Sequence, residues 1–149
     1  MAEILVLDSG PVGDLVGHPG SPRVVAAMAR IESILWRADI VVPEIADYEV
    51  RRELIRRGSV GGLHRLDSLK SRFYFDPITT AAMRQAAEFW AILRQAGRPT
   101  ADPHALDADV ILAAQAVLLG GSNDVVEVVT TNANHLSRLI KSRDWLSLA

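Results

Sequence analysis

Two aspartates stand at the start of an apolar run long enough to form a buried helix, and this combination limits what the chain can fold into. Asp107 and Asp109 lie within residues 106–116, where Val, Ile, Leu and Ala otherwise dominate. A carboxylate at the edge of a hydrophobic core is costly unless it is paired, protonated or bound to a metal. We therefore expect this helix to bring an aspartate to a metal site, together with acids from distant parts of the sequence.

Length and composition favour one globular domain over residues 1–149, large enough to bury a core without covalent cross-links. The absence of cysteine excludes disulfides and thiolate metal sites. No apolar run approaches the roughly 18 residues of a membrane-spanning helix, and the N-terminus lacks the pattern of a signal peptide. We expect a cytoplasmic protein with no membrane contact.

Short apolar runs alternate with amphipathic segments along the chain, which predicts a parallel α/β sheet with right-handed crossovers. Strands are expected at residues 3–7, 40–42, 73–75 and 125–129, with a further edge strand at 145–148. Helices are expected at 22–37, 44–57, 63–69, 79–96, 106–120 and 135–140, and loops at 12–20 and 97–103. Arg98, in the second loop, is expected either to contact substrate or to pair with Asp102.

Acidic residues follow or precede several of these elements at positions that a parallel sheet brings together. Asp8 follows the first strand, and either Glu44 or Glu49 follows the second. Asp107 or Asp109 opens the apolar helix. Oxygen ligands from several carboxylates suit a hard cation such as Mg²⁺ or Mn²⁺, and such a site supports phosphodiester hydrolysis.

Four short motifs, in this order, resemble those of the PIN domain family from residue 3 to about residue 136. They are Asp8-Ser9 after a buried strand, the segment 43–49 with its glutamates, the run 109–114, and the strand end Thr130-Thr131-Asn132. Within that family the chain is similar in length to the VapC-type toxins. The resemblance implies a three-layer α/β/α sandwich with a mainly parallel sheet.

Residue by residue, the resemblance implies that Asp8, Glu49 and Asp109 are catalytic metal ligands, with Glu44 as the competing choice for the second acid. Asp107 is then a helix cap or an additional acid near the metal. The fourth catalytic position, often Asp in the family, is Asn132 here, and His135 replaces an acid commonly found three residues later. These neutral residues reduce the negative charge of the site and argue against tight binding of a second metal ion.

The function implied by the resemblance is a ribonuclease that uses Mg²⁺ or Mn²⁺ to hydrolyse RNA, as the toxin of a toxin–antitoxin pair. Its expected partners are RNA, a small antitoxin protein and a second copy of the chain in a homodimer. The alternative is a PIN-like RNA-binding or scaffolding module with weak or no catalysis. A phosphatase of the haloacid dehalogenase type is disfavoured because the segment 8–11 lacks an Asp-x-Asp pattern.

Each proposed ligand also has a purely structural interpretation. Asp8 suits a turn, one of Asp107 and Asp109 suits a helix N-cap, Glu49 suits a solvated charged face, and Asn132 suits a cap of the last helix.

Two other groups of residues, one basic and one aromatic, also allow more than one interpretation. Seven basic residues lie between positions 51 and 72 against two acids, and Arg51, Arg52, Arg56 and Arg57 form either a solvated helix face or a phosphate-binding surface. Trp36, Trp90 and Trp145 are expected in the core or at an interface rather than stacked on bases.

Overall fold

The computed structural model describes residues 3–96 and 103–148, and for residues 103–105 and 134–135 it describes the backbone alone. The predicted loop at 97–103, including Arg98 and Asp102, therefore lies almost entirely outside the described residues. No helix in the described ranges is long and apolar enough to cross a membrane.

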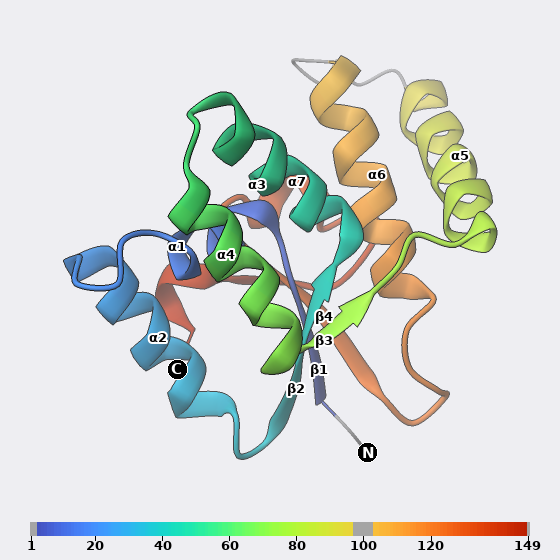
Figure 1. Ribbon diagram of the computed structural model, residues 1–149. Coiled ribbons are helices and arrows are strands. Elements are labelled where there is room, and N and C mark those ends of the chain that lie inside the picture. The colour runs from blue at the N-terminus through green and yellow to red at the C-terminus, as the bar shows by residue number, and fades with distance from the viewer. Residues whose placement is uncertain (1–2, 97–102, 149) are drawn as a thin grey trace.

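A five-stranded sheet forms the centre of the fold, and every neighbouring pair of strands is parallel. The strand order is β3-β2-β1-β4-β5 (Figure 1). The strands are β1 (Glu3–Leu7), β2 (Ala38–Pro43), β3 (Tyr74–Asp76), β4 (Val125–Thr130) and β5 (Ser142–Asp144). The chain builds outward from β1 on one side and then returns to add β4 on the other. The carboxyl ends of β1 and β4 consequently form a topological switch point, where ligands bind in open α/β sheets.

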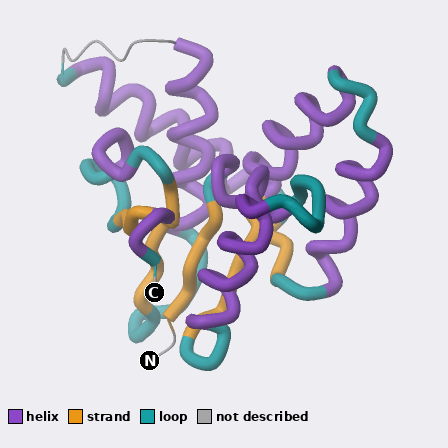
Figure 2. Tube along the Cα trace, turned by 90° about the vertical axis from the view of Figure 1, so that its left-hand side faces the viewer, coloured by secondary structure: helices purple, strands orange, loops and turns teal. Residues whose placement is uncertain are grey.

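Helices cover both faces of the sheet, which confirms the three-layer α/β/α architecture (Figure 2). One core cluster joins Leu5 and Leu7 of β1 to helices on the first face, and another joins Val6 to helices on the second. The first face carries α1 (Ser9–Leu15), α2 (Pro22–Ile34), α3 (Glu44–Arg56) and α4 (Val60–Ser68). The second carries α5 (Thr80–Gln95), α6 (Pro103–Val117) and α7 (Ala133–Leu136).

Helix α1 occupies part of the segment for which the sequence predicted a turn and a loop. Asp8 caps it, because one carboxylate oxygen accepts a hydrogen bond from the Ser9 N–H at 2.7 Å. Pro11 is tolerated because the N–H groups of the first helical turn have no partner within the helix. Val12 and Leu15 are buried against the sheet. The predicted loop was thus wrong up to Leu15, since burial of these two side chains outweighs the helix-breaking tendency of the nearby glycines.

The C-terminal segment also differs from the prediction. The edge strand is Ser142–Asp144, and the predicted strand residues Trp145–Ser147 instead form a short 3₁₀ helix, η2. Asp144 begins this turn by accepting a hydrogen bond from the Leu146 N–H at 3.4 Å. The Trp145 side chain is fully buried, as predicted, and its indole N–H donates to Asp14 at 2.9 Å.

Two smaller corrections concern exposed aromatic side chains and the last helix. Trp36 is 82% exposed and therefore lies outside the core. On α3, Tyr48 and Ile55 are exposed despite their apolar side chains, and the residues buried there are Ile45, Ala46, Asp47, Val50 and Leu54. The last helix begins at Ala133 and ends at Leu136, and so covers only the first part of residues 135–140.

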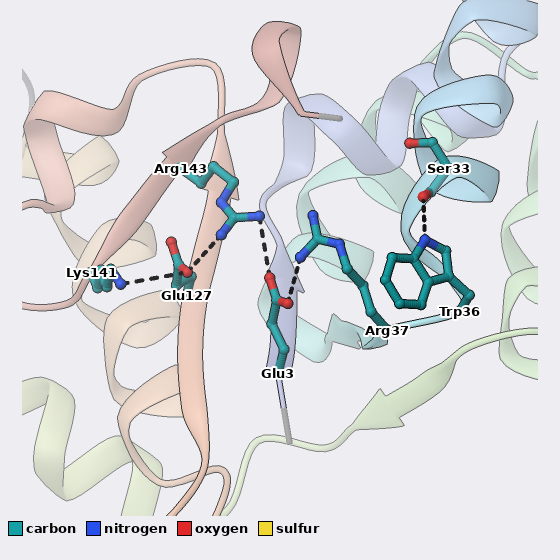
Figure 3. Close-up of polar contacts among 7 residues, drawn as sticks. All are labelled: Glu3, Ser33, Trp36, Arg37, Glu127, Lys141 and Arg143. Carbon is teal, nitrogen blue, oxygen red and sulfur yellow. Dashed lines mark hydrogen bonds and ion pairs between the residues drawn. The ribbon is translucent and has the colours of Figure 1, made fainter. Parts of the chain in front are cut away.

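Acidic and basic side chains form an ion-pair network across β1, β4 and β5 (Figure 3). Glu127, buried in β4, contacts Arg143 at 2.9 Å and Lys141 at 3.7 Å. Glu3 contacts Arg143 at 3.2 Å and Arg37 at 2.5 Å. The network of Glu3, Arg37, Glu127, Lys141 and Arg143 therefore places each acid beside two cations.

Candidate active site

Asp8 lies where the central strand β1 ends, and its side chain is held by two hydrogen bonds. One oxygen accepts from the Ser9 N–H, and the other accepts from the Thr130 hydroxyl at 2.7 Å. The Asp8 N–H in turn donates to the Val129 carbonyl of β4 at 2.9 Å. Asp8 is therefore fixed at the switch point between β1 and β4, in an orientation set by both strands. Asp8 is the N-cap of α1 and not part of a turn, and its carboxylate is half-buried rather than enclosed.

Thr130 is a site residue that sequence reasoning treated only as part of a strand end. Its side chain is fully buried, and its hydroxyl oxygen donates to Asp8 while accepting from the Asn132 N–H at 3.0 Å. A hydroxyl can donate one hydrogen bond and accept others at the same time, so Thr130 joins Asp8 to the backbone of Asn132. The sequence signal that could have identified Thr130 is its position as a β-branched polar residue at the end of an otherwise largely apolar strand.

Glu49 lies on α3, and its pKa is raised to about 6, with burial as the largest cause. The neighbouring charges of Asp8 and, more weakly, Asp109 raise the pKa further, whereas Arg52 and a hydrogen bond from Ser9 lower it. Three carboxylates from different parts of the chain, Asp8, Glu49 and Asp109, are thus close enough to influence one another. We call these three residues the carboxylate cluster.

Glu44, the alternative second acid, is engaged elsewhere. Its carboxylate accepts a hydrogen bond from the Ile78 N–H at 2.8 Å. The pKa of Asp76 is raised mainly by burial, and the charge of Glu44 raises it further. Glu44, at the start of α3, therefore contacts the connection between β3 and α5. The geometry groups Glu49, and not Glu44, with Asp8 and Asp109.

The two aspartates of α6 point in different directions. The helix begins at Pro103, so both lie beyond its first turn and neither is an N-cap, contrary to the capping interpretation. Residues two positions apart on a helix are separated by about 200°. Asp107 is exposed and lines a groove between α5 and α6 together with Met83 and Trp90. Asp109 is half-buried and acts on Glu49.

Gln115 fixes α6, and with it Asp109, against the elements that carry the other acids. Its side-chain oxygen accepts from the Ile45 N–H at the start of α3, at 3.1 Å. Its amide nitrogen donates to the Asp76 carbonyl at 2.7 Å and to the Asp76 carboxylate at 3.1 Å. This almost completely buried amide was read only as a member of the apolar run, because burial of one polar side chain within it has no sequence signature.

Asn132 occupies the N-cap position of α7, but its side chain makes no capping hydrogen bond. The residue is exposed beside Thr130, which its N–H contacts. The side chain of His135 lies outside the described residues. The Asn132 amide therefore faces solvent at the same sheet edge as Asp8.

The basic face of α3 is largely paired with acids. Arg51 bridges Asp47 and Asp67, at 2.9 and 2.6 Å, and so ties α3 to α4. Both Arg56 and Arg57 contact Glu53, the latter at 3.8 Å. Arg52 differs, because it stacks on Tyr48 and lies 3.9 Å from Glu49. Of these four arginines, Arg52 is the one that contacts the carboxylate cluster.

The donor set of the cluster fits a hard divalent cation in chemistry and charge. Mutual repulsion and burial raise the pKa of Glu49, and a bound cation would relieve both effects. Among the described residues, no group of three His, Asp or Glu side chains is already arranged at metal-ligand spacing. Mg²⁺ keeps several of its waters and takes one or two carboxylates directly, so it does not require such a preformed cage.

The sequence matches the PIN domain family over residues 5–141, so the protein belongs to this family. PIN domain proteins are usually nucleases, and these generally depend on divalent metal ions. No curated protein matches the sequence.

Solved structures of toxin–antitoxin complexes share the fold. A chain of VapBC2 from Rickettsia felis, solved with a DNA fragment from its promoter, has a TM-score of 0.72 and 17% identity, covering 95% of this chain and 98% of that one. A chain of VapBC-1 from nontypeable Haemophilus influenzae has a TM-score of 0.66 and 18% identity, with the same coverage. FitAcB from Neisseria gonorrhoeae has a TM-score of 0.61 and 17% identity, covering 97% and 99%. At these identities the likeness shows a shared fold.

Proposed function

We propose that this protein is a metal-dependent endoribonuclease and the toxin of a toxin–antitoxin pair. The observation that carries the proposal is the carboxylate cluster at the switch point of the sheet, with the pKa of Glu49 raised to about 6 by burial and by its acidic neighbours. Membership of the PIN domain family supports nuclease chemistry. The VapBC neighbours support a small antitoxin protein as a partner.

In this proposal Asp8, Glu49 and Asp109 hold Mg²⁺ or Mn²⁺. Such a cation, when bound, polarises the phosphate and lowers the pKa of a water molecule. The Ser9 N–H and the Thr130 hydroxyl keep the Asp8 carboxylate in one orientation, so that its oxygens need little rearrangement. The exposed amide of Asn132 supplies a hydrogen-bond donor for a phosphate oxygen at the same edge.

Cleavage of RNA by the purified protein with Mg²⁺ or Mn²⁺ tests the assignment. We expect Asp8→Asn or Asp109→Asn to lower the rate by roughly 1000-fold or more, because each removes a charged ligand. Asp107→Asn and Glu44→Gln are matched controls and should retain most of the activity, since these acids lie apart from the cluster. Activity that survives both Asp8→Asn and Asp109→Asn would refute the assignment.

A second candidate is an RNA-binding or scaffolding PIN module without catalysis. It is favoured by the neutral Asn132 at the fourth position and by the absence of a preformed three-acid metal cage among the described residues. Titration with Mn²⁺ separates the two candidates. The nuclease should bind the ion and cleave RNA, whereas the module should bind RNA and leave it intact.

We also propose that the chain forms a homodimer. Sedimentation at several protein concentrations tests this directly, because a monomer over the whole range would rule the dimer out.

A further inference from the structure

A pocket of about 420 Å³ lies beside the carboxylate cluster, between α1, α2 and the C-terminal segment. Its two cationic side chains, Arg23 and Arg30, come from α2. Its lining also includes Gly10, Asp14, Thr131 and Leu146. We call this cavity the arginine pocket.

Two residues of the wall of the arginine pocket, Gly10 and Thr131, lie close in sequence to residues that hold Asp8. Gly10 lies two residues after Asp8, and Thr131 follows Thr130, whose hydroxyl donates to Asp8. A Cβ atom on Gly10 would lie 3.3 Å from the Thr131 hydroxyl oxygen, which is tighter than an ordinary contact. The first turn of α1, which Asp8 caps, therefore packs directly against the segment that follows β4, and both contribute to the pocket wall.

Arg30 is held in this pocket by stacking. Its guanidinium lies 5.2 Å from the centre of the Trp145 ring, and that ring is fixed by burial and by its hydrogen bond to Asp14. No carboxylate among the described residues lies within ion-pair distance of Arg30. A guanidinium anchored through an aromatic face keeps its N–H groups available for an anion.

Arg23 adds a second, more flexible cation. It is 80% exposed and approaches Asp14 only to 3.8 Å, a contact that solvent weakens. Asp14 is the one acid of the lining, so the pocket has a net charge of about +1. Arg30 therefore contributes a cation on the α2 side of the molecule, whereas Arg52 contacts Glu49 of the cluster from α3.

We propose that the arginine pocket binds an RNA backbone phosphate next to the phosphate that is cleaved. This inference rests on the proposed function, because it assumes that the cluster receives an RNA strand. The acids of the cluster repel a polyanion, and an adjacent guanidinium offsets that repulsion while fixing the register of the strand. Arg30 then determines which phosphodiester bond lies over Asp8.

Binding of a fluorescein-labelled single-stranded oligoribonucleotide, measured by anisotropy without divalent cation, tests the pocket independently of cleavage. One lost phosphate contact in single-stranded RNA should weaken binding roughly five- to tenfold at about 50 mM salt and reduce the salt slope by about 0.7. We expect this result for Arg30→Gln, and a smaller loss for Arg23→Gln. Arg30→Lys should keep most of the slope because it keeps the charge.

Arg84→Gln is the matched control, since Arg84 is an exposed arginine on α5, on the opposite face of the sheet. Unchanged affinity and slope in Arg30→Gln, or no RNA binding by the unmodified protein, would overturn the proposal. If Arg30→Gln does not fold, Arg23→Gln decides by the same criterion. A glutamate-rich peptide serves as a second probe. If Arg30→Gln loses binding to this peptide but still binds RNA, the proposal would also be overturned, in favour of a protein ligand.

This test and the cleavage test fail separately. If RNA stays intact with Mg²⁺ or Mn²⁺ but binds through Arg30, the nuclease assignment is refuted and the phosphate-binding pocket is supported. If Arg30→Gln cleaves and binds RNA as well as the unmodified protein does, the pocket proposal is refuted and the nuclease assignment stands.

Discussion

The ion-pair network within the sheet and the carboxylate cluster at its carboxyl edge both contain buried or half-buried acids, but the neighbours of these acids differ in charge. In the ion-pair network, Glu3 and Glu127 each lie beside two cations, and Arg143 joins the two acids (Figure 3). In the carboxylate cluster, Glu49 lies near two further acids, and Arg52 is too weak an influence to bring its pKa down to the ordinary value.

The charge of the neighbours distinguishes an acid whose charge is balanced within the chain from an acid whose charge is not. A paired acid has its charge balanced within the chain, so burial costs less than it would for an isolated ion. An acid beside other acids gains from a cation supplied from outside. The charge of the neighbours, together with burial, therefore distinguishes the carboxylate cluster from the ion-pair network.

The largest expected effect is on the ion-pair network. Arg143→Met should destabilise the protein by about 3 kcal/mol near neutral pH, because Glu127 remains buried with only the more distant Lys141. Urea denaturation measures this change, and Arg138→Met, at an exposed position, is the control expected to change stability by less than about 0.5 kcal/mol. A loss as small as that of the control would show that the network contributes little.

Thr130→Val tests how the cluster is held in place. The substitution removes the hydroxyl that donates to Asp8 and accepts from the Asn132 N–H, and should cost about 2 kcal/mol. Thr131→Val, at the exposed neighbouring position, should be nearly neutral by comparison. Equal unfolding midpoints for the two variants would contradict a buried positioning role for Thr130.

Glu49→Gln should act in the opposite direction and stabilise the metal-free protein. Because the folded pKa of about 6 exceeds the ordinary value of 4.5, the folded state holds the proton more tightly. The cost of ionising Glu49 is therefore absent below the lower value, grows between the two, and is complete above about pH 6. The full shift corresponds to about 2 kcal/mol, which partial exposure reduces to about 1 kcal/mol.

Denaturation of wild type and Glu49→Gln on both sides of this pH window measures the difference. The variant should be more stable only on the alkaline side. A variant that is destabilised at every pH would show that Glu49 is already compensated within the chain.

The smallest effect concerns the pKa of Glu49 itself. Arg52→Gln should raise it further, because the guanidinium of Arg52 now lowers it. Arg56→Gln provides the control, since Arg56 pairs with Glu53 and should leave Glu49 unaffected. A pH titration of the Glu49 carboxyl carbon by NMR distinguishes the two variants, and identical curves would exclude an influence of Arg52.

The sequence predicted the sheet and the position of Asp8 because both depend on short apolar runs and on where those runs end. It could not decide between Asp107 and Asp109, because that choice depends on the rotation of α6 about its axis. It could not decide between Glu44 and Glu49 either, because both lie on α3 and the N–H of Ile78 engages only the first.

Other features depended on contacts between distant residues. The hydroxyl of Thr130 acquires its role only when β4 pairs with β1, and Trp145 packs in the core beside α1, where Asp14 accepts its N–H. Neither contact leaves a local pattern in the sequence. The loop predicted after Asp8 failed for the same reason, since the burial of Val12 and Leu15 is a property of the assembled sheet.

The central claim is that a divalent cation binds where acids face acids, and a Mn²⁺ titration followed by paramagnetic broadening of backbone amide signals tests it most directly. We predict that broadening appears first around Ser9, Glu49 and Asp109, and that it weakens as the pH falls through about 6. Signals next to Glu3 and Glu127 should stay sharp. Broadening centred on the ion-pair network, or spread evenly over the surface, would contradict the claim.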